Sequence, residues 1–166
     1  IEDLKLGDEV LSYQVPFLID KFEDCQFENR NDHKFVFGKI THIHNGSESS
    51  FYNINDKIKV TYEHPFLAKI GQFWRYIKAE NLKIGYFLLN SSGEEVEIKS
   101  IEKINKKVKT VNLEIKDFSH FIAESFVVHN ASGSTGGPAV GGGVIKNPEN
   151  DQTTIVIEEA SGSSQL

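Results

Sequence analysis

An internal repeat constrains the fold of this chain more than any other feature of its sequence. The segment Glu2-Asp3-Leu4-Lys5-Leu6-Gly7 recurs as Glu80-Asn81-Leu82-Lys83-Ile84-Gly85. Three looser matches follow in the same order, namely 39–43 with 100–104, 52–54 with 111–113, and 64–68 with 120–123, the last of which pairs His64 with His120. Four matches in one order predict a duplicated domain with an equivalent histidine in each half.

The residues between these landmarks predict an all-β fold. Apolar residues make up 39% of the chain and aromatic residues 11%, which is enough to build a core. Short segments rich in β-branched and aromatic residues alternate with turn clusters such as Asn45-Gly46-Ser47, Asn55-Asp56 and Ser91-Ser92-Gly93. The expected strands are 8–13, 34–44, 50–54, 57–62, 87–90, 95–104, 107–115 and 121–128. Only residues 75–82 hint at a helical turn.

The composition changes near residue 130, where we place a domain boundary. Residues 131–143 contain six glycines in thirteen positions and predict a flexible linker. A β-prone run near 153–157 predicts one short strand that needs a partner. We therefore expect a folded domain over 1–130 and a C-terminal flank over 131–166.

Charge and apolar patterning exclude several classes of protein. The net charge is −6, with lysines and acids interspersed, so a nucleic-acid partner is not expected. The apolar runs are too short to span a membrane, and Ile1 is followed by acids rather than a signal peptide. The chain contains no methionine, which indicates a processed product or a fragment. Cys25 alone forms no intrachain disulfide, and its acidic neighbours predict an unreactive thiol.

Two further clusters have a plain structural interpretation. His42 and His44 alternate on one expected strand, but a zinc site would need a third and a fourth ligand. We interpret them as solvent-exposed strand histidines. Residues 73–76, Phe-Trp-Arg-Tyr, predict an aromatic bend that packs beneath the second repeat.

Two short motifs carry chemistry. Thr61 and His64 stand three residues apart where a strand ends before Pro65; the alternative is an incidental histidine at a strand end. The second motif is His129-Asn130-Ala131. An asparagine side chain can attack its own backbone carbonyl, form a succinimide and break the bond to the next residue. This reaction needs a donor for the oxyanion and a proton for the leaving amine, either of which a histidine can supply.

Residues 1–13, Thr61 to His64 and 111–130 together resemble the Hint superfamily, which comprises inteins, bacterial intein-like domains and hedgehog autoprocessing domains. The resemblance implies a horseshoe-shaped, pseudo-two-fold all-β fold without a homing endonuclease, as in a mini-intein. It also implies single-turnover self-processing without cofactor or metal. Carried over, Thr61 and His64 serve the N-terminal junction, while His129 and Asn130, assisted by His120, serve the C-terminal one. The implied partners are the flanking extein sequences and a complementary N-terminal intein segment, in cis or as a split fragment.

The departures from this pattern are as informative as the matches. The segment that normally precedes residues 1–5 and carries a Cys or Ser nucleophile is absent. Ala131 has no nucleophilic atom, so ligation of the flanks is expected to fail. Asn112 stands where the family often has Asp, with Asp117 as a weaker candidate for the missing acid. His120 lies one residue from the usual histidine register, and the internal repeat is the reason to retain it.

Three histories fit these features. The chain is the long C-terminal piece of a split intein, a domain of a larger protein that cleaves rather than splices, or a precursor trapped by Ala131 in place of a nucleophile. In the second history, the Gly-rich tail suggests that the larger protein is a structural protein of a phage particle. In the other histories, the expected location is the cytoplasm. The rival from another class is a decayed Hint domain kept as an inert structural β module.

Overall fold

A computed structural model describes residues 4–15, 26–27, 29–117, 120–123 and 125–129 of the chain. The described elements are β-strands and one 3-10 turn at Ala79–Asn81, without an α-helix, which confirms the predicted all-β class. In this described part, no helix has the length and apolar character needed to cross a membrane. The strands are β1 Glu9–Gln14, β2 Gln26–Phe27, β3 Lys34–Glu48, β4 Phe51–Ile54, β5 Ile58–Val60, β6 Pro65–Ile70, β7 Phe73–Lys78, β8 Phe87–Leu89, β9 Glu95–Glu97, β10 Ile101–Ile104, β11 Val108–Ile115, β12 His120–Ala123 and β13 Phe126–His129.

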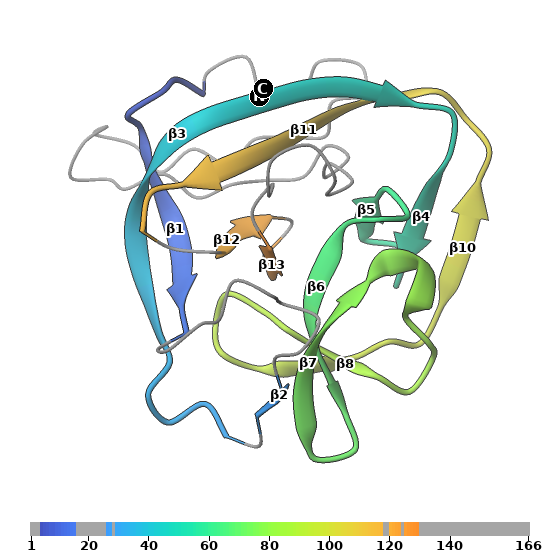
Figure 1. The fold of residues 1–166 in the computed structure, drawn as a ribbon. Helices are drawn as coiled ribbons and strands as arrows, with labels where there is room; N and C mark the ends of the chain where they lie inside the picture. Colours follow the sequence, from blue (N-terminus) through green and yellow to red (C-terminus); the bar gives the residue numbers. More distant parts are fainter. Residues whose placement is uncertain (1–3, 16–25, 28, 118–119, 124, 130–166) are drawn as a thin grey trace.

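The strands form two sheets. The larger runs β11-β3-β1-β12-β13-β6-β7-β2, with β8 and β9 attached through β6, and the smaller runs β10-β4-β5. Figure 1 shows β3 and β11 arching over one side of the molecule, with the short β12 and β13 inside the arch. Every pair among the described strands is antiparallel.

The two copies of the repeated motif have the same local structure. Gly7 and Gly85 both have positive φ, +87° and +96°. The amide of Gly7 donates to Ile40 O, and the amide of Ile40 donates to Asp8 O. In the second copy, Gly85 donates to Ile98 O and Ile98 donates to Tyr86 O. Both copies of the motif therefore form the same turn and make the same pair of backbone hydrogen bonds, to Ile40 in the first half and to Ile98 in the second. This confirms the predicted duplication.

Each half pairs its strands with those of the other half. β1 of the first half pairs with β12 of the second, and correspondingly β8 of the second half pairs with β6 of the first. In the same way β3 pairs with β11, and β10 pairs with β4. The pseudo-two-fold arrangement is thus built from reciprocal pairings, so the two copies form one interlocked unit.

The strand register corrects two of the sequence matches. The equivalent of Ile40 is Ile98, three residues before the match made from the sequence, because both take part in the same motif hydrogen bonds. The register pairs Ser12 with Phe121 and Ala68 with Leu88. If Gly7 is equivalent to Gly85, Ser12 is equivalent to Asn90. Continuing the register of Ala68 with Leu88 by two residues places Asn90 opposite Phe66, so Phe121, the partner of Ser12, corresponds to Phe66. His120 then corresponds to Pro65 rather than to His64. The two histidines are therefore not equivalent.

Several strand boundaries also differ from the sequence prediction. Residues 65–78 form the hairpin of β6 and β7 around Gly71-Gln72, where residues 73–76 were expected to make an aromatic bend. The helical turn expected within 75–82 is present as the 3-10 turn at Ala79–Asn81. The expected strand 121–128 is a second hairpin, β12 and β13, with Ser125 at φ +69°. The expected strand 95–104 is divided into β9 and β10 around residues 98–100. The predicted turn at Asn55-Asp56 is confirmed, with both residues at φ +54°.

The central strands separate two apolar clusters. Alternate side chains of β6, β12 and β13 point to opposite faces. One face contributes Phe66, Phe121 and Val128 to the main core. The other face contributes Leu67, Ile122 and Val127 to a smaller cluster with Tyr13, Trp74, Tyr76 and Leu89. The second cluster forms the surroundings of the candidate functional residues.

Candidate functional site

His120 and His129 lie directly opposite each other on β12 and β13. Their ring centroids are 5.4 Å apart in an edge-on arrangement. His120 is fully buried and His129 is 8% exposed. Tyr76 of β7 closes the group, because its ring stacks on His120 at 5.1 Å and meets His129 edge-on at 5.5 Å. The hairpin thus joins the two histidines that the sequence assigned to the C-terminal junction.

The tautomer of His120 follows from its hydrogen bond. Its Nδ1 lies 3.2 Å from the carbonyl oxygen of Tyr13. A carbonyl only accepts, so Nδ1 carries the hydrogen and the neutral ring keeps its lone pair on Nε2. This Nε2 is buried and makes no hydrogen bond to any residue that the structure describes. His120 therefore presents a basic nitrogen inside the protein.

The surroundings of His120 also hold it in the neutral form. Burial lowers the pKa of His120 well below 6.5, and a positive charge on His129 or His33 would lower it further. The bond to the Tyr13 carbonyl acts in the opposite direction but is outweighed. At neutral pH the ring is uncharged, as a group that accepts a proton must be.

Thr61 and His64 directly precede β6, and the His64 ring packs against the main core. Both side chains are fully buried. The backbone amide of His64 donates to Thr61 O at 3.2 Å, so the two residues begin and end one tight turn. The His64 ring contacts Phe66 and Phe121 of the main core, at 5.8 and 6.5 Å between centroids. The structure therefore separates His64 from the pair of His120 and His129.

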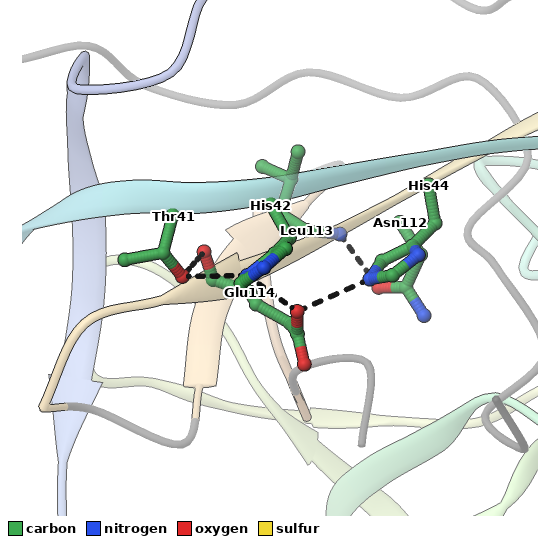
Figure 2. Close-up of polar contacts among 6 residues, drawn as sticks. All are labelled: Thr41, His42, His44, Asn112, Leu113 and Glu114. Carbon is green, nitrogen blue, oxygen red and sulfur yellow. Dashed lines mark hydrogen bonds and ion pairs between the residues drawn. The ribbon is translucent and has the colours of Figure 1, made fainter. Parts of the chain in front are cut away.

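Asn112 occupies the middle of β11, opposite His44 of β3. The side chain is buried, and its Oδ1 accepts from the amide of Leu113 at 2.9 Å. Figure 2 shows Glu114, two residues farther along β11, between His42 and His44. One Glu114 oxygen lies 2.8 Å from His42 Nδ1 and 3.2 Å from His44 Nε2. The His42 side chain is exposed, as expected, whereas that of His44 is 42% exposed and partly buried. Their shared carboxylate was not predicted.

The remaining sequence-predicted residues fall into two groups. Asp117 lies exposed in the turn after β11, with φ +65°. Asn130, Ala131, Cys25, the linker 131–143 and the expected strand near 153–157 lie outside the described residues. Among the residues that are described, no group of three His, Cys, Asp or Glu side chains has the arrangement of a metal site.

Tyr13 and Tyr76 were not identified from the sequence. Tyr13 comes from β1 and Tyr76 from β7, about 60 residues apart along the chain, and both contact His120. No local pattern marks either residue as part of a site, since each resembles an ordinary buried tyrosine on a strand. Only the pairing of β1 with β12 and the position of β7 bring the two tyrosines to His120.

Two solved structures with a similar fold are an intein-like domain and an intein. The bacterial intein-like domain from Clostridium thermocellum has a TM-score of 0.51 at 17% identity, over 78% of this chain and all of that one. The DnaB intein from Synechocystis sp. PCC 6803 has a TM-score of 0.54 at 17% identity, over 77% of this chain and 82% of that one. These similarities define the class of the fold, an intein-type Hint domain.

The sequence then identifies the family. Residues 1–134 match the family described as the pretoxin HINT domain, and this chain belongs to that family. No curated protein has significant sequence similarity to the chain. The family and the fold together make it a Hint-type autoprocessing domain, as the resemblance implied.

Proposed function

We propose that this domain cleaves its own chain between Asn130 and Ala131. The observation that carries the proposal is the buried pair of His120 and His129, since His129 immediately precedes Asn130 in the chain. The substrate is the domain's own C-terminal junction with its flank in cis. The event is a single turnover without a separate substrate.

The proposed step balances without an additional reactant. Nδ2 of Asn130 attacks the carbonyl carbon of Asn130, the bond to the nitrogen of Ala131 breaks, and the first fragment ends in a succinimide. Nδ2 loses one proton and the amine of Ala131 gains one. Nε2 of His120, whose lone pair faces the buried interior, is suited to take the first proton. His129 is then the group that supplies the second.

The same reasoning favours cleavage over splicing for the chain as it stands. Splicing requires a nucleophile after Asn130, and Ala131 has none. We assign Thr61 and His64 to an N-terminal junction whose nucleophile would be a Cys or Ser on a complementary segment, in cis or as a separate fragment. The name of the family connects such domains with pretoxins. Release of a C-terminal flank from a precursor is therefore the biological role that we propose.

Intact-mass measurements test the proposal. The purified chain is incubated at neutral pH, with and without a thiol, and its mass is recorded over days. We expect a product that begins at Ala131, and the masses of the two initial fragments should add up to that of the precursor. Asn130→Ala should abolish the product. Asn105→Ala, a matched change of an exposed asparagine between β10 and β11, should retain it.

An unchanged mass in the unmodified chain would contradict the proposal. It would instead support the rival in which the domain is an inert structural module. Restored cleavage on addition of a peptide with an N-terminal Cys or Ser would show that the two junctions are coupled.

A further inference from the structure

A chain of polar residues lies behind His120, on the side away from His129. Tyr13 is 1% exposed, and its hydroxyl lies 2.9 Å from Nδ1 of His33. Arg30 donates to the same hydroxyl over a longer 3.5 Å. Arg30 is itself fixed by a bond to Gly93 O at 3.3 Å and by its position 4.9 Å over the Trp74 ring. The phenol of Tyr13 is therefore anchored at its outer end.

The protonation states of Tyr13 and His33 limit the possible directions of these hydrogen bonds. Burial, opposed by Arg30, raises the pKa of Tyr13, so the phenol keeps its proton. Burial and the charge of Arg30 lower the pKa of His33 to about 4, so His33 is neutral at pH 7. Arg30 therefore donates to Tyr13. The Tyr13 hydroxyl can in turn donate to Nδ1 of His33 when His33 carries its hydrogen on Nε2, which is the arrangement that the network requires. Neutral His33 places no positive charge near His120.

The other end of Tyr13 holds His120. Pairing of β1 with β12 consists of a single registered pair, Ser12 with Phe121. The next carbonyl of β1, that of Tyr13, accepts from the His120 side chain instead. The Tyr13 ring also meets the His120 ring edge-on at 6.1 Å. Tyr13 thus contacts His120 with both its backbone and its ring.

We propose that Arg30, Tyr13 and His33 form a positioning network that holds His120 in its Nδ1–H tautomer, so that the lone pair of Nε2 can accept a proton. This inference rests on the proposed function, because it gives His120 the proton-accepting role. None of the three residues contacts the reacting atoms in this scheme, and all three act through His120. Besides them, the described titratable groups that face His120 are His129 of β13 and Tyr76 of β7.

Four variants separate positioning from packing. Tyr13→Phe keeps the ring but removes the hydroxyl, and His33→Leu removes the acceptor for that hydroxyl. His33→Gln restores an acceptor and should behave like the parent chain. Tyr52→Phe removes a phenol from β4, distant from the network along the sheet order, and is the matched control. All four changes are made in an Asn130→Ala background for spectroscopy and in the native sequence for cleavage.

The spectroscopic measurement is the ¹⁵N chemical shift of the His120 ring, which reports its tautomer and its titration. We expect a single Nδ1–H tautomer in the parent chain, in His33→Gln and in Tyr52→Phe. Tyr13→Phe and His33→Leu should give a mixture of tautomers. Cleavage in those two variants should slow by about two- to tenfold, the effect of losing one hydrogen bond, with a displaced pH–rate profile.

The two proposals can fail separately. If Tyr13→Phe and His33→Leu retain the parent tautomer and titration while remaining folded, the positioning network is wrong, whatever the cleavage rate. If the tautomer changes as expected but no chain cleaves, the network is confirmed as the device that sets the state of His120, and self-cleavage is wrong. Equal losses in His33→Leu and His33→Gln would also overturn the network, because an acceptor would then have no effect.

Discussion

His120 and His129, the two histidines that we assign to the C-terminal junction, differ in which ring nitrogens are available. Nδ1 of His120 is occupied by the Tyr13 carbonyl, so only Nε2 is available to a substrate. His129 is at the end of β13 and retains 8% exposure, next to the junction itself. Both side chains are imidazoles, so the difference between them arises from their positions on β12 and β13 and from the groups that contact them there.

The separation of His64 from this pair leads to a prediction about roles. His129→Ala should reduce cleavage after Asn130 by about 100-fold or more, the usual contribution of a proton-transfer group. His64→Ala should leave the rate of that cleavage nearly unchanged, because His64 contacts Phe66 and Phe121 on the opposite face. Rates come from the appearance of the fragment beginning at Ala131.

The control for both variants is the melting temperature, since each position is buried. A large loss of cleavage in a folded His64→Ala chain would show that the assignment of roles is wrong. An equally large loss accompanied by unfolding would be traced to the empty space left in the core.

At the scale of elements, the repeated turn is the feature that both halves share most closely. Leu4 and Leu82 are buried, whereas Leu6 and Ile84 are each 66% exposed. The glycine that follows has positive φ in both copies, and a Cβ at either position would meet nothing within 4 Å. The need for glycine at Gly7 and Gly85 is therefore conformational and does not arise from crowding.

This equivalence predicts equal effects. Gly7→Ala and Gly85→Ala should each lower the free energy of unfolding by about 1–2 kcal/mol, the cost of an L side chain at positive φ. Denaturant unfolding of the two variants measures this directly. Lys83→Ala, an exposed neighbour in the motif, should change stability by less than about 0.5 kcal/mol. Clearly unequal losses at the two glycines would contradict the equivalence.

Local turn chemistry predicted some elements correctly and failed at Asn45-Gly46-Ser47, which was expected as a turn but lies inside β3 and pairs with β11. The Asn55-Asp56 turn and the repeated motif were found because their residue types have direct conformational consequences. The β6–β7 hairpin was missed although Gly71 and Gln72 separate two apolar runs, which is a recognisable two-residue hairpin signal. The division of residues 121–128 into two strands depends on Ser125 at positive φ, which its residue type does not indicate.

The candidate site was predictable only in part for a related reason. His120, His129 and Asn112 are in a motif continuous in sequence, so they were identified together. Tyr13, His33 and Tyr76 approach His120 from distant segments, and their proximity is created by strand pairing. The misalignment of His64 with His120 arose because identical residues were matched in preference to equivalent register positions.

At the scale of the whole molecule, buried neutral histidines connect stability with pH. The folded pKa of His33 is lowered to about 4 and that of His120 lies well below 6.5. Between pH 6.5 and about 4 the unfolded chain therefore binds more protons than the folded chain at these sites. Their contribution to stability is complete above pH 6.5 and is lost as the pH falls through this window.

We expect the urea midpoint to fall as the pH is lowered from 7 to 4.5, in an Asn130→Ala background that prevents cleavage. His33→Gln should show a shallower fall than the parent, because the variant has lost one of the titrating groups. Parallel pH dependences of the two chains would contradict the lowered pKa of His33.

The reciprocal pairing of the two halves has a consequence for their independence. The half that contains β1, β3, β4 and β6 contributes strand partners to β8, β10, β11 and β12, and receives the same number in return. A backbone break in the connection after β7 would leave two fragments with unpaired strand edges, each of which the other covers. Such fragments should be poorly ordered alone and should reassemble on mixing. The peptide link between the halves therefore acts mainly by raising the effective concentration of each half near the other, while the strand pairings determine the fold.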